Sequence, residues 1–517
     1  MKYMSFVIAS LCLFSFNVLA IPQVTFTGPT PAFPSTMNVG DDVTYTFVVK
    51  NYANHAWGFS LSGVSTPVTR AAAANDCGSS IPANGSCQFA IQIAPTATGT
   101  IAQTFQINYG SRTPYQASMN ITVNATTELS AVSVGYYTPN TGVRSPVTYY
   151  LNSQSTWEDS IPSSPAATGL SNLTGVSCGL GTDLQNCVTV GYYPNPTVIY
   201  PLVYTSTNAG QAWSNYSPTS YPTNLTGSSL NGVSCIGSTA LTCASVGFYQ
   251  TTTLTNPQPI IYFSSNSGVS WTYATPTAAT STNSNYLESV SCTTANNAAG
   301  LQCIAVGYYV ITGGVSRPMS YSSTDGSTWN LNTTFTLPNV SNLQGVSLKS
   351  VSCSDSSHCV AVGSYSYTGA PTQPLIYYST NGGATWTLVT TLATASNTTS
   401  LSGVSCVEVA GESQAFNCVA VGLPISVSPT LYITNNSDGS TWTTKTLSKY
   451  NGYATSLESI ACQSMNTCYL AGFYTNVYGI PIIYNTTDGF TSTTMTPLTA
   501  QGSGNSTLDS IALTATA

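Results

Sequence analysis

Short runs of alternating apolar and polar residues, separated by Gly, Pro, Ser, Thr and Asn, fill nearly the whole chain. The stretch from 348 to 390 contains four of them, which read LKSVSC, CVAVGSYSY, PLIYY and TWTLVT. Alternation with a period of two, interrupted by turn residues, predicts β-strands joined by hairpins. We therefore expect an all-β protein in which this stretch forms one sheet of four strands.

The same pattern recurs up to the C-terminus. In six copies the first strand ends in a cysteine, and these cysteines lie 57, 57, 61, 53 and 56 residues apart. A second cysteine opens the next strand, as in CVAVGSY and CIAVGYY. Four strands in a unit of about 55 residues are typical of a β-propeller blade. The disulfides expected within the copies join Cys178 with Cys187, Cys235 with Cys243, Cys292 with Cys303, Cys353 with Cys359, Cys406 with Cys418 and Cys462 with Cys468.

The two ends of the repeat region predict the number of blades. The first copy begins at AVSVGYY and lacks an opening strand, whereas the last residues, TLDSIALTA, match an opening strand alone. We expect residues 506–515 to complete the first blade, so that residues 127–517 form a closed ring of seven blades. In that composite blade Leu513 and Ala131 occupy the two cysteine positions, and an apolar pair should replace the disulfide.

Residues 1–20, MKYMSFVIASLCLFSFNVLA, combine one positive charge with an apolar run and small residues before position 21, as a secretory signal peptide does. Residues 21–126 contain runs such as DVTYTFVVKN and CQFAIQIAP, which predict a sandwich of about seven strands. The segment NDCGSSIPANGSCQFAIQIAPTATGT resembles bacterial immunoglobulin-like domains related to the ASPM/SPD-2/hydin family, in which paired cysteines (here Cys77 and Cys87) precede an apolar strand. Such domains usually act as spacers or contact modules.

The amino-acid composition limits the cellular compartments and the kinds of partner that we expect for this protein. Without the signal peptide, fourteen cysteines remain, an even number that favours disulfides outside the cytoplasm over zinc in a chain with only two histidines. Charged residues make up 5% of the chain and the net charge is −7, which argues against nucleic acid as a partner. No later apolar run reaches the roughly 20 residues that cross a bilayer. We expect a secreted or cell-surface protein.

The turn between the third and fourth strands carries a further motif. It reads STNGGATW at 379–386, SSTDGSTW at 322–329, SSNSGVSW at 264–271, STNAGQAW at 206–213 and NNSDGSTW at 435–442. These turns resemble the Asp box, S-x-D-x-G-x-T-W, of the BNR and sialidase-like propellers, and the blade pattern is similar to that of the photosystem II assembly propeller. The resemblance implies a structural turn whose tryptophans belong to the core. The Asp position is assigned to Asn152, Asn208, Asn266, Thr324, Asn381, Ser437 and Thr487.

The resemblance also allows the enzyme hypothesis to be weighed. A sialidase needs three arginines to hold the substrate carboxylate, and this propeller has only Arg144 and Arg317. Another glycosidase would need two carboxylates at one bond, for which Glu458 and Asp509 are the candidate pair. No phosphate-binding loop or metal-spaced histidine cluster is present in the sequence.

The loops between the second and third strands, on the face opposite to the Asp boxes, are rich in tyrosine and contain both arginines. Tyr and Arg are typical of contact surfaces, and we expect ligand contacts there. The alternative is that one ring of each Tyr-Tyr pair lies between blades. The candidate ligand-binding residues are Arg144, Arg317, Tyr137, Tyr193, Tyr249, Tyr309, Tyr367 and Tyr474.

A second set follows from the repeat register, four residues before each first-strand cysteine. These residues should surround the mouth of the central channel: Thr174, Asn231, Glu288, Lys349, Ser402, Glu458 and Asp509. Neighbouring blades would then pair Glu288 with Lys349 as an ion pair. They would also pair Glu458 with Asp509, which can share a proton or bind a cation such as Ca²⁺. The alternative is ordinary polar capping of strand starts, with no metal or other cofactor.

Together these features predict a secreted or surface binding protein that presents a Tyr-rich propeller face to a glycan or a surface protein. The alternative is a carbohydrate-active hydrolase that uses Glu458 and Asp509.

Overall fold

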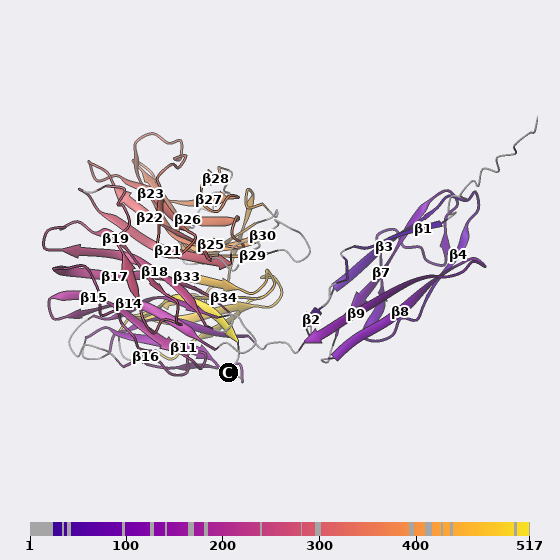
Figure 1. Cartoon of the computed structure of the whole chain (residues 1–517), viewed down its shortest axis with the longest axis horizontal. Coiled ribbons are helices and arrows are strands. Elements are labelled where there is room, and N and C mark those ends of the chain that lie inside the picture. The colour runs from indigo at the N-terminus through magenta and orange to yellow at the C-terminus, as the bar shows by residue number, and fades with distance from the viewer. Residues whose placement is uncertain are drawn as a thin grey trace, which may run out of the picture. The chain divides into compact units, whose positions relative to one another are not determined.

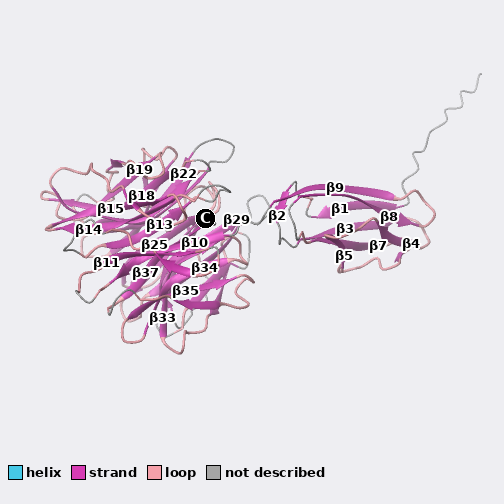
Figure 2. Cartoon of the chain, turned by 90° about the horizontal axis from the view of Figure 1, so that it is seen from below, coloured by secondary structure: helices cyan, strands magenta, loops and turns pink. Residues whose placement is uncertain are grey.

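The computed structural model describes residues 24–30, 32–33, 36–38, 43–95, 99–124, 129–139, 142–152, 154–163, 170–179, 185–237, 240–280, 282–294, 301–390, 392, 398–408, 416–424, 428–434, 438–500 and 504–515. The predicted signal peptide lies outside these residues. The described parts consist of strands, turns and loops (Figure 2), and they contain no helix that could cross a membrane. The chain divides into two compact units, Met1–Thr126 and Thr127–Ala517.

The first unit is an immunoglobulin-like β-sandwich of nine strands, two more than the pattern predicted, because β2 and β6 are too short to show alternation. Its core joins both sheets through rings such as Phe47, Phe89 and Phe105, and the Cys77–Cys87 disulfide is present. One sheet contains β1 (Val24–Thr30), β3 (Val43–Asn51), β7 (Ser86–Ile93) and β5 (Val68–Ala71). The other contains β2 (Thr36–Asn38), β9 (Tyr115–Asn124), β8 (Gly99–Tyr109), β4 (Trp57–Ser62) and β6 (Ser80–Ile81).

The second unit is a propeller of seven four-stranded antiparallel blades, several of which are labelled in Figure 1. Blade 1 contains β37 (Ser506–Ala515), β10 (Leu129–Tyr137), β11 (Ser145–Leu151) and β12 (Trp157–Asp159). Blade 2 contains β13 (Asn172–Cys178), β14 (Cys187–Asn195), β15 (Val198–Ser206) and β16 (Ser214–Asn215). Blade 3 contains β17 (Leu225–Ile236), β18 (Thr242–Thr251), β19 (Gln258–Ser264) and β20 (Thr272–Ala274). Blade 4 contains β21 (Asn285–Thr294), β22 (Leu301–Val310), β23 (Ser316–Ser323) and β24 (Asn330–Asn332).

The remaining three blades follow the same order from the channel outwards. Blade 5 contains β25 (Leu343–Cys353), β26 (Cys359–Tyr367), β27 (Gln373–Ser379) and β28 (Thr387–Leu388). Blade 6 contains β29 (Thr398–Glu408), β30 (Phe416–Pro424), β31 (Thr430–Thr434) and β32 (Trp442–Thr446). Blade 7 contains β33 (Ala454–Cys462), β34 (Cys468–Thr475), β35 (Gly479–Thr486) and β36 (Thr494–Pro497).

The ring closes as predicted. The C-terminal strand β37 pairs antiparallel with β10, and each inner strand contacts the inner strands of both neighbours, including β37 with β13 and with β33. Seven apolar clusters fill the seven spaces between adjacent blades. The core of this unit therefore lies between blades, not within them.

A tyrosine on the third strand of every blade, which the pattern did not single out, is buried in these clusters. The hydroxyl of Tyr321 donates to the carbonyl of Thr277 at 2.7 Å, in the segment that links blades 3 and 4. The third-strand tyrosines are Tyr149, Tyr204, Tyr262, Tyr321, Tyr377, Tyr432 and Tyr484. Part of the tyrosine richness of this chain is thus a repeated core element.

The six predicted blade disulfides are all present. They join Cys178 with Cys187, Cys235 with Cys243, Cys292 with Cys303, Cys353 with Cys359, Cys406 with Cys418 and Cys462 with Cys468. In each blade the two cysteines lie directly opposite each other on the first and second strands. With the sandwich bridge they make seven disulfides, which is typical of a protein outside the cytoplasm.

The second cysteine of each pair is buried almost completely. These residues are Cys187, Cys243, Cys303, Cys359, Cys418 and Cys468, and none is more than 1% exposed. A bonded and buried sulfur cannot contact a ligand, so these cysteines stabilise the blades and do not belong to a binding surface.

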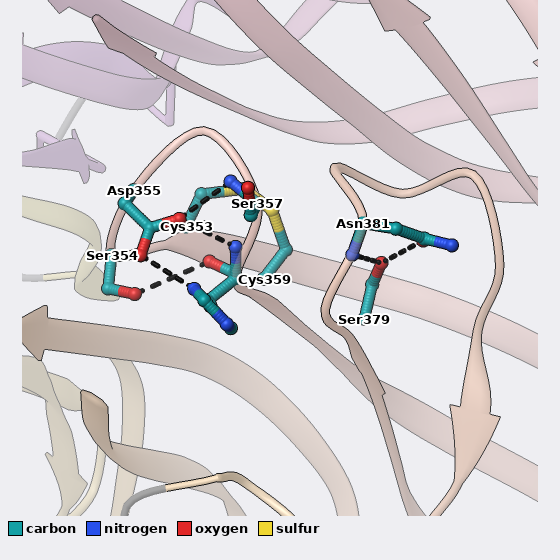
Figure 3. Close-up of polar contacts among 8 residues, drawn as sticks. Cys353, Ser354, Asp355, Ser357, Cys359, Ser379 and Asn381 are labelled. Atoms are coloured by element: carbon teal, nitrogen blue, oxygen red, sulfur yellow. Dashed lines mark hydrogen bonds and ion pairs between the residues drawn. A yellow bond between two sulfur atoms is a disulfide. The ribbon is translucent and has the colours of Figure 1, made fainter. Parts of the chain in front are cut away.

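The disulfide-bearing hairpin and the Asp-box turn of a blade lie together on one face of the ring, here called the disulfide face, as predicted. In blade 5 the amide of Gly382 donates to the carbonyl of Ser357 at 2.8 Å. Figure 3 shows how Asp355 caps the hairpin, accepting from the amide of Ser357, while Ser379 bonds Asn381 in the box turn. Asp355 also accepts from the amide of His358 at 2.8 Å. The two turns of this blade therefore hold each other in place.

The assignment of the box acid was wrong in two described blades. In blade 4 the capping side chain is Asp325, not Thr324, and it accepts from the amides of Ser327 and Thr328 at 2.8 and 2.7 Å. In blade 7 it is Asp488, not Thr487. The blade 4 turn is one residue shorter than its relatives, so an alignment on its first serine shifts the acid by one place. Ser437 lies outside the described residues. Of the box tryptophans, Trp271, Trp329, Trp386 and Trp442 are buried, as expected.

Candidate functional site

Every inner strand carries a β-bulge at the same height, and its extra residue belongs to the set predicted from the repeat register. The register skips Glu288 in β21 and Lys349 in β25, and the corresponding residue in the other five strands. We call these residues, Thr174, Asn231, Glu288, Lys349, Ser402, Glu458 and Asp509, the channel ring; all are half-buried. Thr174 is the third residue of β13 and Lys349 the seventh of β25, so the ring lies inside the channel wall and not at strand starts.

A glycine on the second strand makes this bulge possible. A Cβ on Gly307 would lie 1.9 Å from the carbonyl oxygen of Tyr286 on the inner strand, and the equivalent glycine of each other blade would meet the same contact at 1.9–2.0 Å. This is the glycine of the repeated C-x-x-V-G pattern. The pattern is therefore the sequence signal of the bulge, although the cysteine spacing alone did not reveal it.

Three ring residues tie one blade to the next through hydrogen bonds. Thr174 donates to the carbonyl of Leu230 at 2.6 Å, Asn231 to that of Leu287 at 2.8 Å, and Ser402 to that of Leu457 at 3.0 Å. These contacts are ordinary hydrogen bonds between inner strands, although they are not the capping of strand starts that the sequence suggested as the alternative. The charged residues of the channel ring are therefore the candidates for ligand binding or catalysis.

Glu288 and Lys349 form the predicted ion pair, with Nζ and Oε1 at 2.9 Å. The Lys349 ammonium also lies 5.3 Å from the ring centre of Tyr308, within cation–π range. Burial, with the nearby charge of Glu288, raises the pKa of the Tyr308 hydroxyl. This hydroxyl therefore stays protonated and can donate a hydrogen bond at neutral pH.

Three aromatic rings continue from this ion pair along the loop face, which is the face opposite to the disulfide face. Tyr286 stacks on Tyr308 with ring centres 5.1 Å apart, and Phe248 of blade 3 meets Tyr286 edge-on at 5.2 Å. All three side chains are half-buried. Phe248, Tyr286 and Tyr308 form what we call the aromatic row, and none of them was in the predicted ligand set.

Glu458 and Asp509 lie at adjacent ring positions three blades away from the ion pair. Glu458 accepts from the Ser456 hydroxyl at 3.0 Å, and burial together with the negative charge of Asp509 raises the pKa of Glu458 to about 7. Asp509 accepts from Asn172 at 3.0 Å and from Thr507 at 3.0 Å, and burial raises its pKa as well. The predicted carboxylate pair is thus brought together.

Arg144 lies on the same side of the channel. Its guanidinium carbon is 3.8 Å from the ring centre of Tyr136, and its positive charge lowers the pKa of Asp509 against the larger effect of burial. Arg317 lies opposite Tyr309 in the strand register and donates to the carbonyl of Ser316 at 3.1 Å. The two arginines therefore have different surroundings, and only Arg144 approaches the channel ring.

Two of the predicted ligand tyrosines are core residues, and the other four are half-buried. Tyr249 and Tyr474 are each 8% exposed, and both belong to the apolar clusters between blades. Tyr137, Tyr193 and Tyr309 pack against such clusters too. In a Tyr-Tyr pair the second ring turns between the blades, so the first ring, such as Tyr136 or Tyr308, is the one beside the channel.

Tyr367 differs from these residues. It is half-buried and stacks with Tyr365 at 6.1 Å. For Tyr137, Tyr193 and Tyr309, the packing agrees with the alternative considered from the sequence, that one ring of each Tyr-Tyr pair lies between blades.

No family model matches this chain, and no curated protein matches it. Among solved structures, it is similar to an α-L-arabinofuranosidase from Fusarium graminearum, with 11% identity and a TM-score of 0.36, over 58% of this chain and 87% of that one. It is also similar to the Hadza microbial sialidase Hz136, with 10% identity and a TM-score of 0.37, over 84% and 90%. An ulvan lyase gives 10% identity and a TM-score of 0.36, over 72% and 90%. At these identities the likeness concerns the fold alone.

Proposed function

We propose that this protein is an extracytoplasmic binding module that takes a glycan at the loop-face opening of its propeller channel. One observation carries the proposal: the aromatic row ends on the Glu288–Lys349 pair at the channel ring. Half-buried ring faces stack on the apolar faces of sugars, while a carboxylate, an ammonium and a phenol hydroxyl bind sugar hydroxyls. The sandwich, which resembles bacterial immunoglobulin-like domains, would serve as a spacer or contact module.

The geometry supports a hydrolase less well. A pKa of about 7 suits Glu458 as a general acid, but a glycosidase also needs its second carboxylate ionised, as nucleophile or base. Burial raises the pKa of Asp509 in the same direction. A raised pKa disfavours the ionised form of Asp509 that the second role requires.

The proposal is tested by screening the mature protein on a glycan array and measuring the affinity of any ligand found. Tyr286→Ala and Tyr308→Ala should each weaken binding about 5- to 150-fold, which is the equivalent of the roughly 1–3 kcal/mol that stacking of a nucleic-acid base on an aromatic side chain contributes. Tyr216→Ala is the matched control, because Tyr216 is 38% exposed and lines a cleft with the box residue Asn208 on the disulfide face.

Binding that survives both row substitutions would remove the row from the site. Turnover of a glycan that is lost in Glu458→Gln would favour the hydrolase. An array without any ligand would overturn the glycan and direct attention to a surface protein.

A further inference from the structure

The channel-ring residues of blades 7 and 1 differ from the others in the chemical groups that they present to each other across the blade boundary. Elsewhere a ring side chain donates to the next blade, as Thr174 and Ser402 do, or meets an opposite charge, as Glu288 does. Between blades 7 and 1 two carboxylates, Glu458 and Asp509, occupy the corresponding places. Both are acceptors when ionised, so neither ring side chain can donate to the other across this boundary.

The side chain of Asn172 provides a second, independent observation at this boundary. Its side chain is 7% exposed, and its Nδ2 donates to Asp509 Oδ2 at 3.0 Å. Its Oδ1 is buried, and no hydrogen-bond donor among the described residues reaches it. A buried carbonyl oxygen without a partner costs about 1–3 kcal/mol, and here it belongs to a side chain that already contacts the Asp509 carboxylate, so it is available as a further oxygen ligand.

The charges around the pair point the same way. Among the described residues, the positive group that acts on Asp509 is Arg144, the one guanidinium in this part of the channel. Two carboxylates and one guanidinium leave one negative charge uncompensated in a half-buried place. Either a proton or a bound cation can supply the missing charge, and a cation can at the same time take the free oxygen of Asn172 as a ligand.

We propose that the boundary between blades 7 and 1 binds a hard cation, with Ca²⁺ as the first candidate, through the carboxylates of Glu458 and Asp509 and the amide oxygen of Asn172. Ca²⁺ combines carboxylate, amide-carbonyl and water oxygens in irregular sets, whereas Mg²⁺ demands near-ideal octahedral geometry. Because Asp509 lies on the C-terminal strand β37, the cation joins this strand to its neighbours in blades 2 and 7. The site is separate from the aromatic row and does not depend on glycan binding.

Calorimetric titration of the EDTA-treated, dialysed full-length mature protein with CaCl₂ tests the proposal, together with thermal melts in CaCl₂, MgCl₂ or NaCl at matched ionic strength. We expect saturable Ca²⁺ binding and a rise in Tm that exceeds the rise in MgCl₂ and is absent in NaCl. Glu458→Gln and Asn172→Ala should each weaken Ca²⁺ binding at least tenfold. Glu408→Gln, at an exposed acid of β29, removes the same charge and should leave it unchanged.

Arg144→Ala separates this proposal from a purely structural role. Removing the guanidinium should tighten Ca²⁺ binding, because a repelling charge beside Asp509 is lost. A wild-type protein with no Ca²⁺-dependent change would overturn the proposal in favour of a shared proton. Ca²⁺ binding that is unchanged in both Glu458→Gln and Asn172→Ala would also overturn it, since the ion would then lie elsewhere. Either result leaves the glycan proposal untouched, because that is measured on the array.

Discussion

Ala131 of β10 lies directly opposite Leu513 of β37, at the position where each of the other six blades has a disulfide. Both side chains are buried in the cluster between blades 7 and 1. The propeller thus closes on backbone pairing and an apolar contact at the one blade whose strands come from both ends of the repeat region. The closing blade lacks the covalent link that the other blades have.

The double variant Ala131→Cys with Leu513→Cys should form an additional disulfide, because the bonded pairs of blades 2 and 5 have the same register. It would close a loop of several hundred residues, for which the chain-entropy account gives about 6 kcal/mol of stabilisation. Denaturant unfolding of the oxidised variant and wild type measures the gain, with each single cysteine variant as a control. No gain in a protein whose new bond is shown by mass spectrometry would mean that ring opening does not limit unfolding.

Gly307→Ala tests the origin of the bulges. The added methyl would lie 1.9 Å from the Tyr286 carbonyl oxygen, so the inner strand must move or the bulge must be lost. We expect a destabilisation of about 3 kcal/mol or more, at the upper end of the usual effect of overpacking. Gly313→Ala is a control for a glycine with open space around it, although its φ of +95° adds some strain. Equal stability of Gly307→Ala and the wild type would show that the backbone tolerates the side chain.

Much of the architecture could be read from the sequence because the repeat supplies seven comparisons of one unit. The register that aligned Leu513 with the cysteines also placed Glu288 next to Lys349, and the ion pair confirms it. The repeats follow one another along the chain as the blades follow one another around the ring. Residues at the same position of the repeat therefore lie at equivalent places in their blades.

The candidate site could be predicted only in part, because two facts depend on side-chain direction. Alternation along a strand does not say which ring of Tyr308 and Tyr309 turns towards the channel, and the predicted set contains Tyr309, which packs against the cluster between blades 3 and 4. The aromatic row also joins Phe248 of one blade to Tyr286 of the next, a contact between residues 38 positions apart that no periodicity specifies. Asn172 was missed for the same reason, since its partner Asp509 lies at the other end of the repeat region.

Tyr321→Phe tests the repeated third-strand tyrosine. The ring would remain in the cluster between blades 3 and 4, while the hydrogen bond to the Thr277 carbonyl would be lost. We expect a loss of about 1 kcal/mol in unfolding free energy, the usual net value of one hydrogen bond. Tyr273→Phe, at a 36% exposed position on the outer strand of blade 3, should change stability by less than half as much. A neutral Tyr321→Phe would mean that the hydroxyl does not hold the linking segment.

Because the pKa of Glu458 is raised in the folded protein, the free energy of unfolding depends on pH, and the sign of this dependence follows from the shift. Its pKa is about 7 in the folded protein, against 4.5 for an unperturbed glutamate as in the unfolded chain, so the folded state holds the proton more tightly. The stabilisation is therefore fully present below pH 4.5 and is lost as the pH rises through 7. At about 1.4 kcal/mol per pKa unit the loss amounts to about 3 kcal/mol in the absence of a bound cation. The raised pKa of Asp509 acts with the same sign.

Denaturant unfolding in EDTA at pH 5 and pH 8 measures this effect in the wild type and in Glu458→Gln. The glutamine keeps the shape of the protonated acid but cannot ionise, so the difference between the two proteins should change by about 2.5 kcal/mol between pH 5 and pH 8, in favour of the variant at the higher pH. Comparing the two proteins cancels other titrating groups such as Asp355, whose pKa is lowered and whose effect has the opposite sign. If the unfolding free energies of the two proteins changed in parallel with pH, Glu458 would be ionised and well solvated in the folded protein. A separate measurement in saturating Ca²⁺ should flatten the pH dependence of the wild type if the cation replaces the proton.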